Sequence, residues 1–284
     1  MGLPVSYGSY EELLADKKID FVFNPLPNHM HLEWIKKAAD AKKHILCEKP
    51  LGLNAAEAKE AADYCKKKGV LLMEAFMYRF HPQWRRAADL VEAKELGLVK
   101  AINCIFSYDN KDPKNIRNIA KYGGGALLDI GCYAVSSARL LMRAEPKRAF
   151  FLAEKDADFG TDILGTGILD FGAGRRSSFT ISTQLFSMQR VDAYGTGGSL
   201  SVEVPFNMFG DVPGRLHVRT DVSHRVVETE IVDQYLLEFD AFAQSILDKT
   251  EVPTPISDAI ANMAVLDALA ASAKAGTWVD VIKY

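Results

Sequence analysis

The chain has no excess of basic residues and no dense set of cysteines. In its 284 residues, 34 Lys and Arg stand against 37 Asp and Glu, which gives a formal net charge of −3. A general nucleic-acid-binding protein carries a basic surplus to neutralise phosphates, so we expect no nucleic-acid partner. The cysteines lie far apart and form no CxxC pair: Cys47, Cys65, Cys104 and Cys132. We therefore expect a reduced, cytoplasmic protein without a disulfide framework.

The sequence also lacks long apolar runs, internal repeats and low-complexity segments. Charges interrupt every apolar stretch before it reaches membrane-spanning length, and the first eight residues contain no apolar core of signal-peptide length. Hydrophobic residues make up 48% of the chain and charged residues 25%, the balance of a soluble globular protein. We expect no membrane partner, and one large domain or two ordinary ones.

Short strand patterns and helix patterns alternate in the first third of the chain. The strands are expected at 19–23, 44–47 and 70–76, and the helices at 9–14, 31–42 and 54–67. Asn54 is a typical N-cap for the last of these helices, and Gly69 is a typical terminator. This alternation predicts right-handed βαβ units around a parallel sheet.

The pattern changes after about Phe80. Segments rich in β-forming residues follow one another, with three helices among them. The segments are 99–108, 150–153, 165–171, 178–184 and 190–204, and the helices are about 127–142, 235–247 and 257–275. We predict a partial dinucleotide-binding, Rossmann-like domain over residues 1–80. An α+β domain with a large, mostly antiparallel open sheet is predicted over residues 81–284.

Polar residues follow two neighbouring strands of the predicted parallel sheet. Pro27, Asn28 and His31 come after the first strand, and Glu48 and Lys49 come after the second. Ligands bind at the carboxyl ends of strands in open α/β sheets. A lysine there can donate a hydrogen bond to a substrate oxygen, and burial would lower its pKa. The alternative is an ordinary turn at the end of a strand.

A second cluster lies at the start of a predicted helix. Three glycines, 123–125, precede Asp129 and Tyr133, which are four residues apart and so share one face of a helix. The glycines permit close approach of another backbone or a ligand, and Gly131 suits close helix packing. The Tyr133 hydroxyl can pass a proton to a substrate oxygen. The alternative is a structural tyrosine whose hydroxyl binds Asp129.

A metal site is not expected. His29 and His31 are close in sequence, but no Cys, Asp or Glu cluster accompanies them at the spacing of metal ligands.

Taken together, these segments resemble the Gfo/Idh/MocA oxidoreductase family, which includes glucose–fructose oxidoreductase and dimeric dihydrodiol dehydrogenases. The resemblance covers essentially the whole chain in the right order. It rests on YEELL (10–14), PNHMH (27–31), CEKP (47–50), MEAFMYRFHP (73–82), GGALLDIGCY (124–133), YGTGGSL (194–200) and the helix at 262–276.

The resemblance implies hydride transfer between a nicotinamide cofactor, NADP or NAD, and a carbinol or carbonyl carbon of a sugar or diol. Lys49 would bind and polarise the reacting oxygen, Tyr133 would be the acid or base, and Asp129 would orient the substrate. The cofactor-binding residues would be Pro27, Asn28, His31, Glu48 and Lys49 on the nicotinamide-ribose side, with Arg79 near the floor of the cleft. Members of this family commonly pair through the second-domain sheet, so a homodimer or higher homo-oligomer is expected.

One element of the family pattern is missing from these residues. The sequence contains no G-x-G-x-x-G turn and no P-loop. We expect the chain to begin beyond the first two strands of the family fold, which would leave the strand at 19–23 with an open edge. A start codon assigned too late or an alternative transcript, a deliberate fragment, or a natural chain that no longer binds the cofactor normally would each account for this.

Two alternatives to a dehydrogenase therefore stay open. The first is a truncated, non-catalytic family member that acts as a binding or assembly protein. The second is an enzyme that uses the nicotinamide only for transient oxidation, as an epimerase or glycosidase does.

Overall fold

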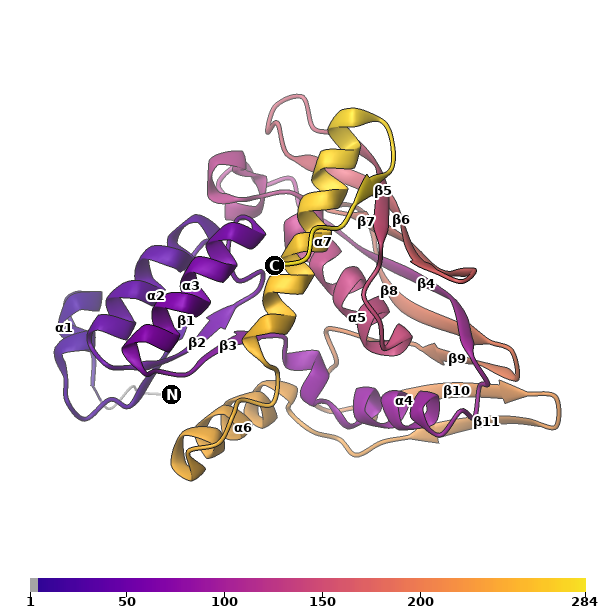
Figure 1. Ribbon diagram of the computed structural model, residues 1–284, viewed down its shortest axis with the longest axis horizontal. Helices are drawn as coiled ribbons and strands as arrows, with labels where there is room; N and C mark the ends of the chain where they lie inside the picture. The colour runs from indigo at the N-terminus through magenta and orange to yellow at the C-terminus, as the bar shows by residue number, and fades with distance from the viewer. Residues whose placement is uncertain (1–4) are drawn as a thin grey trace.

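The computed structural model describes residues 5–284 and contains two β-sheets, one small and parallel, the other large. Helices lie between the two sheets, and the long C-terminal helix runs along their junction (Figure 1). The sequence prediction of a Rossmann-like parallel sheet followed by a large open sheet is confirmed.

The small sheet has the strand order β1-β2-β3, and all its pairings are parallel. Its strands are β1 (Phe21–Asn24), β2 (His44–Glu48) and β3 (Leu72–Ala75). One face packs against α2 (His31–Asp40) and α3 (Ala55–Lys68), while the short α1 (Tyr10–Ala15) precedes β1. As predicted, Asn54 caps α3 by accepting a hydrogen bond from the backbone N–H of Glu57 at 2.9 Å. Gly69 ends the helix in the left-handed conformation.

Two helices from the end of the chain pack back onto this small sheet. The second face of the sheet is covered by α6 (Gln234–Asp248), whose Phe242 lies in one apolar cluster with Leu46 and Met73. Helix α7 (Ile256–Ala275) packs against α3 on one side and against the large sheet on the other. The domain boundary near Phe80 stays a prediction, because elements from both sides of it share these cores.

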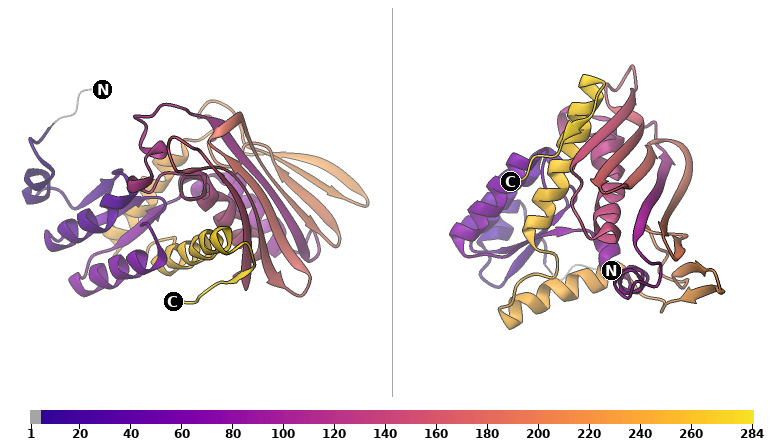
Figure 2. Two further views of the ribbon diagram at one scale, coloured as in Figure 1. Left: turned by 90° about the horizontal axis from the view of Figure 1, so that it is seen from above. Right: turned by 45° about the vertical axis from the view of Figure 1, so that its right-hand side comes forward.

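The large sheet has nine strands in the order β11-β10-β9-β8-β4-β7-β6-β5-β12. Every pairing is antiparallel except that of β4 with β7. Its helices lie on one face, and the other face is open (Figure 2). The strands are β4 (Val99–Asp109), β5 (Arg148–Lys155), β6 (Asp162–Gly172), β7 (Arg175–Ser182), β8 (Gln184–Gly195), β9 (Gly198–Val202), β10 (Arg215–Thr220), β11 (Ser223–Glu228) and β12 (Val279–Asp280).

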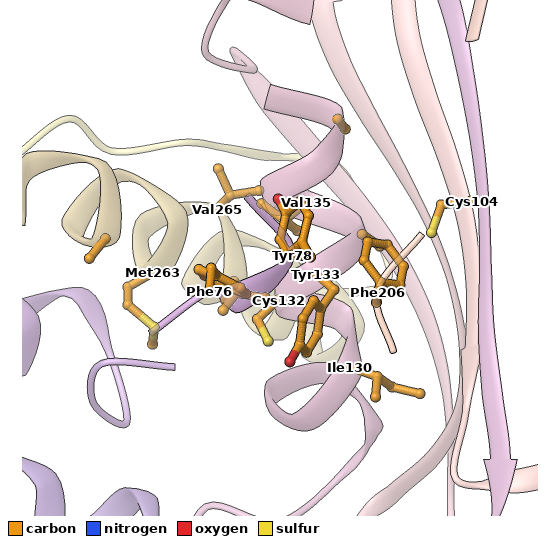
Figure 3. Close-up of a cluster of buried hydrophobic side chains, with 14 of the residues drawn as sticks. Phe76, Tyr78, Cys104, Ile130, Cys132, Tyr133, Val135, Phe206, Met263 and Val265 are labelled. Atoms are coloured by element: carbon orange, nitrogen blue, oxygen red, sulfur yellow. The ribbon is translucent and has the colours of Figure 1, made fainter. Parts of the chain in front are cut away.

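An aromatic cluster fills the core where the two parts meet (Figure 3). Tyr78 comes from η2 (Met77–Phe80), Trp84 from α4 (Pro82–Glu92), Phe106 from β4 and Tyr133 from α5 (Cys132–Met142). The ring of Phe206 contacts all four of these rings, with centroid separations of 5.0–6.2 Å. Such rings bury large apolar areas and favour defined relative orientations. Tyr133 is therefore held in place by the packing of its ring.

Three features differ from the sequence prediction. Helix α4 was not expected, although Pro82 at its first turn and His81 as its cap are recognisable start signals. The hairpin of β10 and β11 was also not expected. The β-rich run 190–204 is two strands, because Thr196 and Gly197 turn between β8 and β9.

Two helical stretches are long and apolar enough to span a membrane by length and composition alone: Ala120–Met142 and Ile256–Ala275. Most of the first and half of the second is buried inside the protein, as is usual for core helices.

Candidate functional site

A cavity of about 430 Å³ opens at the carboxyl ends of β1 and β2, between the small sheet and the large one. This volume lies within the range of small-molecule sites. The lining contains residues from both polar clusters that were predicted from the sequence. It includes Leu26, Asn28, Glu48, Lys49, Tyr108, Arg117, Asp129, Tyr133, Asn207 and Tyr235.

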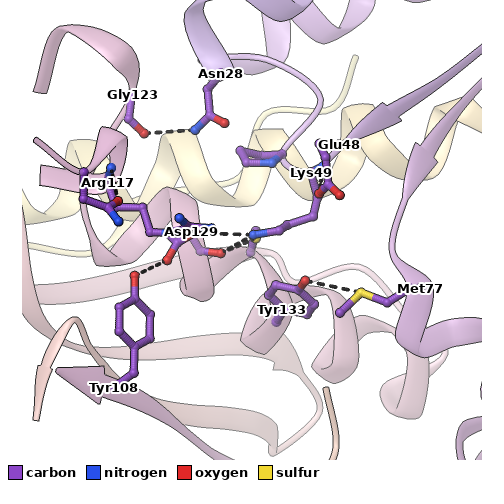
Figure 4. A network of polar contacts seen from close by, with 12 residues as sticks. Asn28, Glu48, Lys49, Met77, Tyr108, Arg117, Gly123, Asp129 and Tyr133 are labelled. Carbon is purple, nitrogen blue, oxygen red and sulfur yellow. Dashed lines mark hydrogen bonds and ion pairs between the residues drawn. The ribbon is translucent and has the colours of Figure 1, made fainter. Parts of the chain in front are cut away.

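Lys49 joins the two parts of the site (Figure 4). It directly follows β2, and its Nζ donates a hydrogen bond to the backbone oxygen of Asp129 at 2.7 Å. The same Nζ lies 3.5 Å from the Asp129 carboxylate and 4.7 Å from the ring centroid of Tyr133. The chain therefore brings Lys49, Asp129 and Tyr133 together in one cavity.

Asp129 lies in η5 (Leu127–Gly131), a short π-helix that leads directly into α5. Its carboxylate accepts a hydrogen bond from Arg117 Nε at 2.9 Å and another from the hydroxyl of Tyr108. Burial acts to raise the pKa of the Asp129 carboxyl, but Lys49 and Arg117 stabilise its charge, and the pKa lies below its ordinary value. Asp129 is therefore an ionised carboxylate with three fixed partners.

The charge of Lys49 depends on this carboxylate. Burial alone acts to lower the pKa of the Lys49 amine, but the Asp129 carboxylate outweighs it, and the pKa lies above its ordinary value. The sequence-based expectation of a lowered pKa considered burial only, and the ion pair corrects it. Lys49 is therefore a cation at neutral pH.

The hydroxyl of Tyr133 faces the cavity rather than Asp129. Its nearest partner is the sulfur of Met77, at 3.5 Å, and no hydrogen bond joins it to Asp129 among residues 5–284. The phenol is buried, and burial raises its pKa well above the usual value. The structural alternative, a Tyr133 hydroxyl bound to Asp129, is therefore not what this chain adopts.

The short helix η4 (Ala120–Tyr122), which lies between β4 and α5 in the chain, contacts η1 (Asn28–Met30) directly. Asn28 Nδ2 donates to the backbone oxygen of Gly123 at 2.9 Å, and the rings of His29 and Tyr122 stack with centroids 4.4 Å apart. Gly123 has φ +79°, and a Cβ at this position would lie 2.4 Å from Leu53. The close approach expected of these glycines is confirmed.

Gly131 has the packing role that the sequence suggested. A Cβ there would lie 3.0 Å from the side chain of Ile181, on β7 beneath the π-helix. A larger residue at this position would press against the side chains of Ile181 and Leu127.

Three of the expected cofactor-binding residues do not line the cavity. Both ring nitrogens of the buried His31 bind backbone oxygens, of Pro50 at 3.0 Å and Leu26 at 2.7 Å. Arg79 forms an ion pair with Asp258 at 2.6 Å. Pro27 precedes η1 without reaching the cavity wall. His31 and Arg79 thus bind other parts of the protein, whereas Asn28, Glu48 and Lys49 line the cavity. Their expected roles toward a cofactor stay predictions.

Sequence reasoning missed the residues that hold Asp129. Tyr108 lies near the end of the predicted strand 99–108, and Arg117 lies in η3 (Ile116–Asn118), a stretch without any recognisable motif. Neither position has a neighbour in sequence that marks it as functional. Their relation to Asp129 arises only from the folded chain.

Three carboxyl groups, one of them on the cavity wall, are largely buried and close to one another. Burial raises the pKa of Glu48, and it raises the pKa of Glu74 to about 7 and that of Glu238 to about 9. Glu238, on α6, is 1% exposed. Its neighbours Glu48 and Glu74 add further unfavourable negative charge. Glu238 is therefore a neutral acid at pH 7. Despite these carboxyl groups, residues 5–284 contain no group of three or more His, Cys, Asp or Glu placed to hold a metal ion.

Comparison with protein families gives two matches along the chain. Residues 1–76 match the model described as the oxidoreductase family, NAD-binding Rossmann fold. Residues 84–201 match the model described as the GFO/IDH/MocA C-terminal domain. The two matches meet close to the predicted boundary at Phe80.

Individual relatives agree with these models. An NADP(+) D-xylose 1-dehydrogenase of Haloferax volcanii is 39% identical, over 99% of this chain and 86% of the relative. A trans-1,2-dihydrobenzene-1,2-diol dehydrogenase of Xenopus tropicalis is 34% identical, over 73% of this chain and 62% of the relative. The crystal structure of KijD10, a 3-ketoreductase from Actinomadura kijaniata in complex with NADP and TDP-benzene, superposes with a TM-score of 0.88 at 28% identity. It covers 93% of this chain and 81% of that one.

Glu238 gives the stability of the protein a defined pH dependence. It keeps its proton up to about pH 9 in the folded chain, whereas an unfolded glutamate loses it near ~4.3. Between these two pKa values Glu238 is protonated in the folded protein and ionised in the unfolded one. Its contribution to the stability of the folded protein is therefore complete below the pKa of the unfolded state, and it is lost as the pH rises toward the pKa of the folded state. We predict that Glu238→Gln becomes progressively more stable than the unsubstituted protein between roughly pH 5 and pH 9.

Urea unfolding at several pH values measures this difference. Glu154→Gln is the matched control, because Glu154 is exposed at the end of β5. The control should show the same stability difference at every pH. A difference for Glu238→Gln that does not change with pH would show that Glu238 is ionised in the folded protein.

Proposed function

The chain belongs to the Gfo/Idh/MocA oxidoreductase family, and from this we propose that it transfers a hydride between NADP or NAD and a carbinol or carbonyl carbon of a sugar or diol. The observation that carries the proposal is the meeting of Lys49 and Tyr133 in one cavity, with Nζ 4.7 Å from the ring centroid. Alcohol oxidation releases a hydride and a proton together, and the protein has to handle the proton.

The relatives support this substrate class. One is named a D-xylose dehydrogenase and another a dihydrobenzenediol dehydrogenase, and both names describe a carbinol or diol substrate. A structural neighbour is a 3-ketoreductase, which works on a carbonyl group. A cavity of about 430 Å³ has room for a monosaccharide beside a nicotinamide ring.

The residues at the ends of β1 and β2 fit the nicotinamide half of the cofactor. Asn28 and Glu48 place polar groups on the cavity wall where ligands of open α/β sheets bind, beside Lys49. When bound there, the nicotinamide supplies or accepts the hydride. We assign no residue of this chain to the pyrophosphate, because the 284 residues contain no G-x-G-x-x-G turn.

In this proposal Lys49 binds the reacting oxygen of the substrate. Its amine is buried and cationic, so it donates a charged hydrogen bond and polarises a carbonyl group. Asp129 keeps that charge in place. Arg117 and Tyr108 hold the Asp129 carboxylate in a fixed position beside the Lys49 amine. The hydrogens of the Lys49 amine that do not bind Asp129 are available to the substrate.

Tyr133 exchanges the proton. With its raised pKa the phenol keeps its proton at neutral pH, which is the state that carbonyl reduction requires of an acid. In the direction of oxidation the phenol first gives its own proton to solvent, and the resulting phenolate, stabilised by the nearby Lys49 cation, then accepts the proton of the substrate hydroxyl. Both residues therefore act on one substrate oxygen.

We also propose a homo-oligomer that forms through the open face of the large sheet. Apolar side chains are exposed on this face, opposite to the buried Val191 and Ala193 of β8. An apolar patch of this kind on a long sheet indicates a protein interface. Its side chains are Leu152, Leu164, Phe186, Met188 and Tyr194. A cytoplasmic location stays a prediction from the cysteine content.

Substitution of the two groups proposed to act on the substrate oxygen, Lys49 and Tyr133, tests the catalytic proposal. We expect Lys49→Met and Tyr133→Phe each to lower kcat for an aldose or diol by about 100-fold or more, the usual contribution of a positioned acid or base. The measurement is the absorbance of the reduced cofactor with a panel of aldoses and diols. Lys66→Met and Tyr64→Phe, on the outer helix α3, are the matched controls and should keep normal rates.

Unchanged turnover in both site variants would contradict the assigned roles. No turnover of any aldose or diol by the unsubstituted protein would favour the alternative, a binding or assembly protein without catalysis. An epimerase or glycosidase would convert a sugar without net change in free cofactor.

Light scattering after size-exclusion chromatography tests the oligomer. Phe186, 87% exposed, is the most exposed side chain of the apolar patch, so Phe186→Asp should shift the protein to the monomer. Leu247→Asp, at an exposed apolar position on α6, should leave the oligomer intact. A protein that is monomeric at every concentration, or an oligomer unaffected by Phe186→Asp, would contradict the interface.

A further inference from the structure

The turn Val204–Asn207 has its backbone bound by side chains from three different elements. Gln83 of α4 donates to the carbonyl of Val204 at 2.9 Å, and Trp84 donates to that of Pro205. Gln234 of α6 donates to the carbonyl of Phe206 at 2.8 Å. From β8, the Gln189 Oε1 accepts from the N–H groups of Phe206 and Asn207, both at 3.0 Å. Every residue of the turn is thus held through its main chain.

This arrangement carries a cost to stability. Gln83 is fully buried and Gln234 is 2% exposed, and in each the Oε1 atom has no hydrogen-bond partner among residues 5–284. Buried unpaired amide oxygens are destabilising. Apolar residues at both positions would fill the space without that cost. The amides are therefore explained best by a need to fix the turn.

The fixed turn places two successive residues on the site. The ring of Phe206 packs against that of Tyr133, with centroids 5.1 Å apart. Asn207, the next residue, lines the cavity. Its carboxamide makes no hydrogen bond to the rest of the chain described, residues 5–284. A free carboxamide offers two donor hydrogens and an acceptor oxygen, which matches the two-way hydrogen bonding of a hydroxyl group.

We propose that Asn207 binds a substrate hydroxyl beyond the carbon next to the reacting one, and so selects an aldose or similar polyol over a diol on an apolar ring, which has no such hydroxyl. This inference rests on the proposed function. The reacting oxygen already has Lys49 and Tyr133, so Asn207 is available to a more distant hydroxyl. A substrate that lacks this hydroxyl forms one hydrogen bond fewer, so it gains less binding free energy than an aldose does.

The test compares Asn207→Leu with the unsubstituted protein on two kinds of substrate. For an aldose such as D-xylose, KM should rise by about tenfold with little change in kcat. A tenfold change corresponds to about 1.4 kcal/mol, which is the free energy expected for one lost hydrogen bond. For trans-1,2-dihydrobenzene-1,2-diol, KM should stay the same or fall. Phe209→Ala, at an exposed position just beyond the turn, is the control and should change neither value.

A second measurement separates this inference from the proposed function. Binding of D-xylose, followed by saturation-transfer NMR in the presence of NADP, does not require turnover. Loss of xylose binding in Asn207→Leu supports the inference even if the protein oxidises no substrate. Equal xylose binding and equal KM in both proteins, or no xylose binding by the unsubstituted protein, would overturn it. Because Asn207 is exposed, the variant should keep the melting temperature of the unsubstituted protein.

Discussion

The ion pair between Lys49 and Asp129 is the interaction on which the site depends. It joins the end of β2 in the small sheet to the π-helix that lies over the large one. Each partner sets the charge of the other: the carboxylate keeps the buried amine protonated, and the amine keeps the buried carboxyl ionised. If either were absent, the remaining charge would be buried without compensation, which is strongly unfavourable. The cavity and its chemistry therefore exist only when the two parts of the chain are together.

The packing around Tyr133 complements this ion pair. Phe106 and Phe206 contact its ring from two sides, and Phe76 from a third. These contacts orient the phenol without a hydrogen bond to a charged group, so its hydroxyl stays available to a ligand. The small parallel sheet thus supplies the cation, while the aromatic core at the junction supplies the phenol.

Much of this fold could be predicted from the sequence, because its signals are local. The Asn54 cap, the Gly69 terminator and the alternation of strands and helices each act over a few residues. The prediction that Lys49 and Tyr133 share one site came from the family resemblance, because periodicity alone does not relate residues so far apart in the chain. The contacts of Tyr108 and Arg117 with Asp129 could not be predicted, because no motif in the neighbouring sequence indicates them.

Two polar residues of the family segments lie away from the cavity wall. His31 and Arg79 belong to the segments that carry the resemblance, yet in the folded chain their polar atoms bind other parts of the protein. Whether a polar side chain faces a cavity or the protein interior is decided by tertiary contacts. The pKa of Lys49 likewise follows from Asp129, which is 80 residues away in the chain.

The central claim is that an amine and a phenol from distant segments act on one substrate oxygen. A crystal structure with the reduced cofactor and an alditol, which has no carbonyl group to accept the hydride, tests it most directly. The account predicts one hydroxyl oxygen of the alditol within hydrogen-bond distance, about 2.6–3.2 Å, of both Lys49 Nζ and the Tyr133 oxygen. An alditol whose oxygens reach only one of these groups, or that binds outside this cavity, would contradict it.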